Sequence, residues 1–153
     1  MVQYIYINDL FYLFDKTEVC NIADDTTPFA CDADISTVIR NLESDTGSAV
    51  LWYDANYMKL NQIKCHFIMS SNSAEFFWIK VGEQIIWESD QRKLLGVIVD
   101  KKLKFDKHVE SMCKKAKQKV TALSRLVNIV PLEQKKLLMN TFIEQQFSHC
   151  PFV

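Results

Sequence analysis

Two adjacent aspartates, Asp24 and Asp25, are the residues whose type and spacing most clearly permit chemistry. They stand between two short β-prone runs, EVCNIA and TTPFACD, which predicts a β-hairpin with the acids at its tip. Adjacent carboxylates on a tight turn can face one cation, and hard oxygen ligands suit Mg²⁺. Phosphoryl transfer by two metal ions needs such carboxylates beside the reacting phosphate. Paired Asp residues are also common in turns for conformational reasons alone, so both interpretations stay open.

The segments after the acids must position this hairpin. Pro28 lacks a backbone N–H and predicts that the return strand is short or at an edge. Residues 34–57 read as one long helix that packs on a sheet, with Asp34 or Ser36 as N-cap and a bend or break at Gly47. The apolar or small residues at helical spacing are Ile35, Val38, Ile39, Leu42, Thr46, Ala49, Val50, Tyr53 and Tyr57.

Three further β segments are predicted in the middle of the chain. Residues 64–69 suggest a strand that follows the polar LNQ turn. The run FFWIKVGEQIIW alternates around Gly82-Glu83, which favours a two-residue hairpin. The run RKLLGVIVD reads as one apolar strand that ends at Asp100, and Gly96 inside it marks a bulge or the close approach of a backbone or ligand.

The last third is predicted to be helical, and the change near residue 103 is the best candidate for a domain boundary. Pro131 suits the first position of a second helix, with Glu133 in its first turn. Leu137, Leu138, Phe142 and Ile143 would form the apolar face of that helix, which Phe147 extends. The apolar stripe of the first helix comprises Phe105, Val109, Met112, Cys113, Ala116, Val120, Leu123, Val127 and Val130.

The charge of the chain is divided between its ends. The 153 residues carry a net charge of −1, with 48% apolar and 24% charged residues, as in an ordinary globular protein of one domain or two small ones. Three Gly and three Pro exclude collagen-like and Pro/Gly-rich disordered classes. Residues 1–50 hold two basic and nine acidic side chains, whereas residues 101–153 hold eleven basic and four acidic ones. This asymmetry suggests two surfaces with different partners.

The basic third could bind the phosphates of a nucleic acid, because each Lys or Arg that neutralises a phosphate releases counterions. An ordinary amphipathic helix also has a solvated polar face, and both interpretations stay open. The residues concerned are Lys114, Lys115, Lys117, Lys119 and Arg125.

The five cysteines include no CxxC pair and their number is odd, which argues against a disulfide scaffold or a zinc ribbon. Cys65-His66 and His149-Cys150 could ligate a metal, but small buried thiols beside polar histidines are the better interpretation. A reducing, intracellular setting without a disulfide partner fits.

Residues 1–14 are apolar, but they lack the basic n-region of a signal peptide and are too short to span a bilayer. We therefore expect a buried helix there, as though cut from a longer one, and no membrane partner.

Several of these motifs together resemble the reverse transcriptases of non-LTR (LINE-like) retrotransposons. Ile22-Ala23-Asp24-Asp25 resembles the aromatic-Ala-Asp-Asp box, and IYINDLFYL resembles the helix that follows the family's Pro-Gln-Gly turn. LNQIKC is similar to the next motif, and Leu94-Leu95-Gly96-Val97 to the primer-grip hairpin. The final run from Ser124 resembles the helical thumb. The resemblance covers nearly the whole chain in the order of the family.

The resemblance implies a role for each matching residue. Asp24 would ligate the catalytic Mg²⁺ ions and Asp25 would assist, while Lys64 would donate a proton to departing pyrophosphate. Leu95 and Gly96 would hold the primer end against the active site. The chain departs from the family at Ile22, where Tyr or Phe is usual. It also begins after the family's other metal-binding Asp and its Pro-Gln-Gly dNTP pocket, and it has no fingers region, so two-metal catalysis should be very weak.

We therefore expect an α+β chain: a partial polymerase palm of β-hairpins packed on helices at residues 1–102, then a truncated, all-helical thumb at residues 103–153. The expected function is that of a fragment of an RNA-directed DNA polymerase, a nucleotidyltransferase with an incomplete two-metal Mg²⁺ site. Its partners would be an RNA template, a DNA primer and, in the parent enzyme, dNTPs, with nuclear localisation implied by the family alone. The alternatives are a non-catalytic remnant that binds nucleic acid through its basic helices, and a fragment that folds poorly and has no activity.

Overall fold

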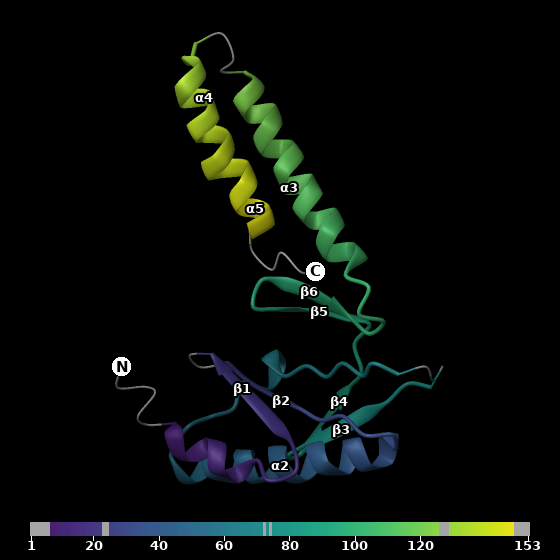
Figure 1. Ribbon diagram of the computed structural model, residues 1–153. Helices are drawn as coiled ribbons and strands as arrows, with labels where there is room; N and C mark the ends of the chain where they lie inside the picture. The colour runs from purple at the N-terminus through teal and green to yellow at the C-terminus, as the bar shows by residue number, and fades with distance from the viewer. Residues whose placement is uncertain (1–6, 23–24, 72, 74, 126–128, 149–153) are drawn as a thin grey trace. The chain divides into compact units, whose positions relative to one another are not determined.

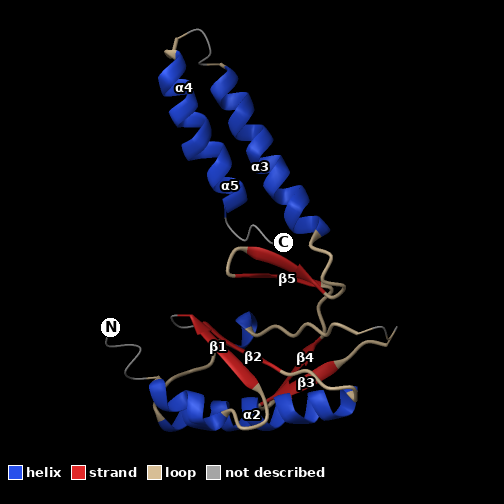
Figure 2. Ribbon diagram, viewed as in Figure 1, coloured by secondary structure: helices blue, strands red, loops and turns tan. Residues whose placement is uncertain are grey.

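The computed structural model describes residues 7–22, 25–71, 73, 75–125 and 129–148 (Figure 1). The chain divides into two compact units. The first comprises Met1–Met69 and Ser73–Glu88, and the second comprises Ser70–Asn72 and Ser89–Val153. The fold is a mixture of helices and small antiparallel hairpins, as expected (Figure 2). The division into palm and thumb domains at residue 102 stays a prediction.

The first unit is built on one long helix. Its elements are the 3-10 helix η1 (Asn8–Leu13), strands β1 (Glu18–Ile22) and β2 (Asp25–Phe29), helix α2 (Ile35–Ala55), the 3-10 turn η2 (Gln62–Lys64), and strands β3 (Trp78–Val81) and β4 (Gln84–Trp87). Both hairpins of this unit lie on α2 in Figure 1, and β2, β3 and η1 all contact that helix. Helix α2 therefore supports the hairpin that includes Asp25.

Helix α2 begins at the predicted N-cap. The Asp34 carboxylate accepts hydrogen bonds from the Ser36 and Thr37 hydroxyls, at 2.6 and 2.8 Å, and from their backbone N–H groups, both at 3.2 Å. These bonds favour the ionised carboxyl and lower the pKa of Asp34 to about 2. The helix runs without interruption through Gly47, so the predicted break is wrong.

At the C-terminal end of α2, backbone N–H groups donate hydrogen bonds to carbonyls of the last turn. The Tyr57 N–H donates to the Asp54 carbonyl at 3.1 Å, and the Met58 N–H donates to the Tyr53 carbonyl at 2.9 Å. This pair of bonds is a Schellman motif, which requires a left-handed residue at the position after the C-cap. Tyr57 occupies that position with φ 58°, although glycine is the usual residue there.

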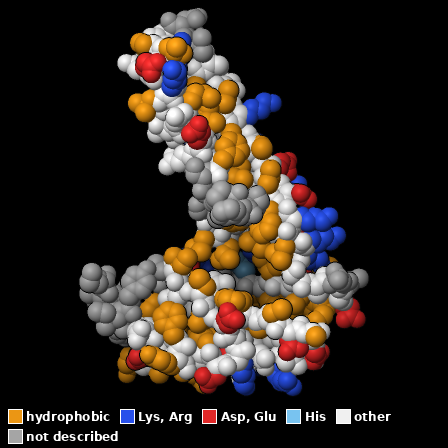
Figure 3. Space-filling model, viewed as in Figure 1, with side chains coloured by type: hydrophobic (Ala, Val, Ile, Leu, Met, Phe, Trp, Pro, Cys, Tyr) orange, Lys and Arg blue, Asp and Glu red, His pale blue; other side chains and the backbone are white. Residues whose placement is uncertain are grey.

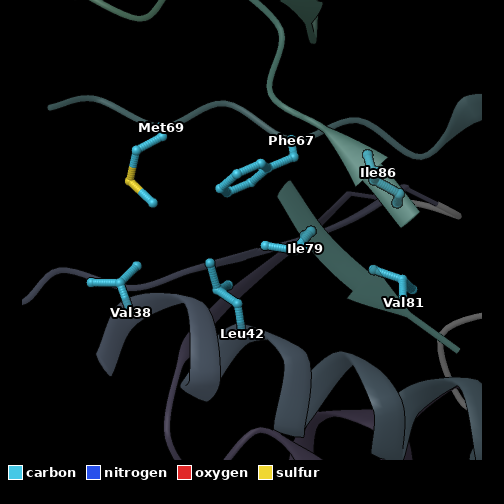
Figure 4. Packing of buried hydrophobic residues seen from close by; sticks show 7 residues of the cluster. All are labelled: Val38, Leu42, Phe67, Met69, Ile79, Val81 and Ile86. Atoms are coloured by element: carbon cyan, nitrogen blue, oxygen red, sulfur yellow. The ribbon is translucent and has the colours of Figure 1, made fainter. Parts of the chain in front are cut away.

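The core of the first unit lies between α2 and the β3–β4 hairpin (Figure 4). Ile79 and Ile86 pair across the strands and point inward, while Trp78 and Trp87 pair on the other face and stay exposed. This alternation confirms the hairpin predicted around Gly82, which has φ 60°. The buried apolar residues of the cluster are Val38, Leu42, Phe67, Met69, Ile79, Val81 and Ile86.

Two expectations for the first unit need correction. Residues 64–69 do not form the predicted strand: Lys64 ends the turn η2, and Phe67 makes only a single parallel bridge with Glu88. Two apolar side chains of this segment, Phe67 and Met69, pack in the hydrophobic core, and the segment does not pair in a β-ladder. The described part of the predicted N-terminal helix is the 3-10 helix η1, in which Leu10 is buried but Tyr12 is largely exposed.

The second unit comprises a hairpin and a helical arm. Its elements are strands β5 (Gln91–Leu94) and β6 (Val97–Asp100), helix α3 (Asp106–Ser124), helix α4 (Leu132–Met139), the π-helix η3 (Asn140–Glu144) and helix α5 (Gln145–Ser148). Pro131 is the N-cap of α4 and not its first residue, and Glu133 lies in the first turn as predicted. No helix among the described residues is long and apolar enough to cross a membrane.

The buried side of α3 differs from the predicted stripe. His108 and Ala116 are buried on this helix, whereas Val109 and Val120 are 41% and 45% exposed and Cys113 is exposed. The backbone N–H of Ile98 in β6 donates to His108 Nδ1 at 3.3 Å. The buried side of α3 therefore includes His108, which is not part of the predicted apolar stripe, and only some of the stripe is buried.

Candidate catalytic hairpin and nucleic-acid interface

The hairpin predicted around the acidic pair is present as β1 and β2. The strands pair from Glu18 opposite Phe29 to Ile22 opposite Asp25, which leaves residues 23 and 24 between them in the sequence. Asp25 is exposed as the first residue of β2, and Asp24 lies outside the described residues. Within the described chain β2 pairs only with β1, so Pro28 lies in a strand with one free edge.

Of the two predicted Mg²⁺ ligands, only Asp25 lies among the described residues. The Asp25 carboxylate is a hard oxygen ligand that water can reach, which suits a hydrated magnesium ion. No group of three His, Cys, Asp or Glu side chains comes close enough to hold a metal ion in the part of the chain that is described. Asp25 alone therefore does not complete a two-metal centre, and the contribution of Asp24 stays a prediction.

A buried carboxylate that the sequence analysis did not single out ties the entry of β1 to α2. Asp45 is 3% exposed, and its Oδ2 accepts bonds from the Lys16 N–H, the Thr17 N–H and the Thr17 hydroxyl, each at 2.9 Å. Asp45 lies three residues after Leu42 and four before Ala49, within the buried face of the helix. An acid in an apolar stripe is the sequence signal that predicts such a buried acceptor.

Another residue of α2, Tyr53, lies close to β2. The hydroxyls of Thr26 and Tyr53 are 3.4 Å apart, and the Thr26 hydroxyl also donates to the Asn21 side-chain oxygen at 3.0 Å. Thr26 directly follows Asp25, so these contacts position the backbone beside the acid. Tyr53 was expected on the packing face of the helix, and the structure places it there.

Lys64 is the third residue to which the resemblance assigns a catalytic role. It is exposed at the end of η2, where its backbone N–H donates to the Asn61 carbonyl at 3.0 Å. The turn, rather than a strand, positions its side chain. A role for Lys64 in proton donation stays a prediction.

The two residues that the resemblance assigns to a primer grip form a tight turn between β5 and β6. Leu95 and Gly96 have φ values of 48° and 95°, and they join Leu94 to Val97 in a two-residue hairpin. Two successive residues with positive φ are typical of a type I′ turn. The prediction of one continuous strand, made from the residues, is therefore wrong, whereas the hairpin implied by the resemblance is present.

A second aspartate links this hairpin to α3. The Asp100 carboxylate accepts bonds from the backbone N–H groups of Lys102, Lys104 and Phe105, at 3.0, 3.3 and 2.7 Å. Desolvation raises the pKa of Asp100, but the hydrogen bonds outweigh it and hold the pKa below its ordinary value. Phe105 begins the helix with φ 59°, a conformation that these bonds support. In the sequence, an Asp that ends a strand just before a polar turn was the signal that could have predicted this role of Asp100.

The basic residues of α3 lie on its solvent side. Lys114, Lys115 and Lys117 are exposed, Lys119 is half-buried, and Arg125 caps the helix and is exposed. Lys114 and Lys117 are one turn apart, as are Lys115 and Lys119, so they form two neighbouring rows. None of these four lysines pairs with a carboxylate among the described residues, in contrast to Lys107, which lies 3.3 Å from Glu110.

The dimensions of this surface suit a nucleic-acid backbone. At about 1.5 Å per residue, the eleven steps from Lys114 to Arg125 span roughly 16 Å along α3. One strand of a duplex presents roughly five phosphates over that length. The surface can therefore contact several phosphates at once.

The described cysteines Cys20, Cys31, Cys65 and Cys113 are free thiols.

Comparisons with family models, curated proteins and solved structures found no match to this chain. The family resemblance therefore rests on the motifs themselves.

Proposed function

We propose that this chain is the palm and thumb portion of a non-LTR retrotransposon reverse transcriptase, which binds a primer–template duplex through α3. The parent enzyme would add dNTPs to the primer end with Mg²⁺. The 153 residues contain no Pro-Gln-Gly turn, and no motif among them matches the family's other metal-binding Asp. We therefore expect this polypeptide to bind nucleic acid without extending a primer.

The observation that carries the proposal is the Leu95–Gly96 turn. Reasoning from residue types alone predicts an uninterrupted strand here, and only the resemblance implies a hairpin. The structure has a two-residue hairpin at this position. The resemblance implies this hairpin, whereas local residue patterns do not. The hairpin therefore supports the family assignment more strongly than the acidic pair does, because the preference of Asp for turns also explains the acidic pair.

The distribution of charge supports the binding mode. Residues 101–153 have eleven basic and four acidic side chains, and four α3 lysines have no carboxylate partner among the described residues. Residues 1–50, with two basic and nine acidic side chains, would repel phosphates unless a cation intervened. Binding without Mg²⁺ should therefore take place through the second unit.

Substitution of two unpaired lysines tests this interface. Lys114→Ala/Lys117→Ala should weaken binding to a primer–template duplex and lower the slope of log affinity against log salt by about 1.8, since each phosphate contact contributes about 0.9. Fluorescence anisotropy across a salt series measures both quantities. The matched control is Lys107→Ala/Lys136→Ala, which removes two lysines that already pair with Glu110 and Glu133. Equal effects of the two double substitutions would refute a specific α3 interface.

A primer-extension assay tests the catalytic half of the proposal. We expect no extension by this polypeptide with Mg²⁺ and dNTPs. Extension that is abolished by Asp24→Ala would show that the two-metal site is complete, so the expectation of inactivity would be wrong while the assignment to the family would gain support. Binding with no extension is the result that we expect, and the alternative of a non-catalytic remnant predicts the same result.

A further inference from the structure

A short segment joins the β5–β6 hairpin to α3, and a side chain at each of its ends ties the two elements together. We call this segment, residues 100–108, the joint. At its start, the Asp100 carboxylate accepts three backbone N–H bonds from within the joint. At its end, His108 is 4% exposed, and its Nδ1 accepts the Ile98 N–H of β6 at 3.3 Å. The hairpin and the first turn of the helix are therefore bonded to each other.

The backbone of the joint is strained. Leu103 and Phe105 have φ values of 52° and 59°, in the left-handed region that favours glycine. Other residues keep such a conformation only where surrounding contacts hold it, and they cluster at functional sites. Here the Asp100 carboxylate accepts the Phe105 N–H at 2.7 Å, and the Asp100 carbonyl accepts the Leu103 N–H at 2.9 Å. The strain indicates that the joint does more than connect two elements.

His108 is a poor residue for packing alone. Its Nε2 is buried and has no hydrogen-bond partner among the described residues. A buried ring with only one bonded nitrogen costs more free energy than an apolar side chain of similar size. What the histidine supplies is an acceptor for the N–H of Ile98, two positions after Gly96. The bond therefore restrains the hairpin that ends in the Leu95–Gly96 turn.

The joint separates the two surfaces of this unit to which we assign nucleic-acid contacts. The Leu95–Gly96 turn belongs to the hairpin, and the rows of lysines that begin at Lys114 belong to α3. Figure 3 shows Lys and Arg side chains (blue) near the beginning of α3 and farther along it. Two contacts on one rigid body strengthen each other only if their geometry lets both engage the same ligand. A rigid joint meets that condition.

We propose that His108 is a positioning residue that holds the Leu95–Gly96 turn in place relative to the α3 lysines, so that both contact one duplex at its primer end. This inference rests on the proposed function. The lysines would bind the phosphates of any duplex, whereas the turn would contact only a duplex with a recessed 3′ end. The joint thereby gives the chain a preference for such an end over a continuous duplex.

Fluorescence anisotropy of the full chain tests the proposal with two duplexes of the same number of base pairs, one continuous and one with a recessed 3′ end. We expect the recessed end to bind at least about tenfold more tightly, because the second contact acts at a high effective concentration. His108→Leu removes the acceptor and should bring the ratio of the two affinities close to one, with the salt slope unchanged. His108→Asn keeps an oxygen near the position of Nδ1 and should restore the ratio.

A measurement on the free chain separates positioning from misfolding. Amide hydrogen exchange at Ile98 should be slow in the unsubstituted chain, faster in His108→Leu and slow again in His108→Asn. Circular dichroism checks that each variant keeps its helices. The matched control is His66→Leu, which replaces an exposed histidine of the first unit and should leave the affinity ratio unchanged.

Three results would overturn the inference and leave the proposed function in place. The first is equal affinity of the unsubstituted chain for the two duplexes. The second is a preference for the recessed end that survives in His108→Leu. The third is a loss of preference that His108→Asn does not restore, which would assign the effect to packing rather than to the bond. Absence of binding to either duplex would instead refute the proposed function, and the inference with it.

Discussion

Removing the buried carboxylate of Asp45 should destabilise the unit that carries the acidic hairpin. One oxygen of this side chain accepts three hydrogen bonds, and the Thr17 N–H that donates one of them is buried. In Asp45→Ala that N–H and the half-buried Lys16 N–H lose their acceptor, while the Thr17 hydroxyl can rotate. A buried donor without a partner costs about 1–3 kcal/mol, so we expect a loss of about 3 kcal/mol in the free energy of unfolding.

The chain contains a convenient probe for this measurement. Its three tryptophans, Trp52, Trp78 and Trp87, all belong to the first unit. Tryptophan fluorescence in a urea titration therefore reports the unfolding of that unit alone. With a slope of about 2 kcal/mol per molar urea, a loss of 3 kcal/mol lowers the midpoint by about 1.5 M.

Graded substitutions separate the hydrogen bonds from general effects on the helix. Asp45→Asn keeps a carbonyl oxygen at the position of Oδ2 and should cost less than Asp45→Ala. Thr17→Val removes only the hydroxyl bond and should cost about 1 kcal/mol. Asp54→Ala makes the same change as Asp45→Ala at an exposed position of α2 and should fall within about 0.5 kcal/mol of the unsubstituted chain. If Asp45→Ala is as mild as Asp54→Ala, the carboxylate does not hold β1 on the helix and our reasoning is wrong.

Three further perturbations follow from the backbone and from the N-cap. Tyr57→Gly should stabilise the first unit by about 1 kcal/mol, because Tyr57 is almost fully exposed with φ 58° in a position that favours glycine; no gain in urea midpoint would contradict the strain. Gly82→Ala should destabilise it by at least about 1 kcal/mol, since φ is 60° and the new Cβ would lie 3.2 Å from Val50 Cγ1. Asp34 has a pKa of about 2 against an ordinary 3.8, so its contribution to stability is fully present above about pH 4 and is lost as the pH falls through 2. The difference in melting temperature between the chain and Asp34→Ala should therefore shrink from pH 5 to pH 2, and a constant difference would exclude this linkage.

The elements that depend on neighbours in the sequence could be predicted from residue types. The N-cap of α2 was predictable because Asp34 bonds to groups two and three residues away. The hairpins at Gly82 and beside Asp25 were predictable because turn residues and alternating strands lie within a dozen positions of each other. The proposed roles of Asp25, Leu95 and the α3 lysines likewise rest on short motifs, whose residues are close together in the sequence.

Features that depend on contacts between residues far apart in the sequence were decided only by the tertiary structure. Residues 64–69 have the composition of a strand, but Phe67 and Met69 gain more by filling the core over α2 than by pairing in a ladder. On α3, the polar His108 is buried and accepts a bond from the backbone of Ile98, a contact that no periodicity in the helix predicts. Val109 and Val120 of the apolar stripe stay at the surface. The sequence of an amphipathic helix shows which residues are apolar, but only the packing of neighbouring elements decides which of them are covered.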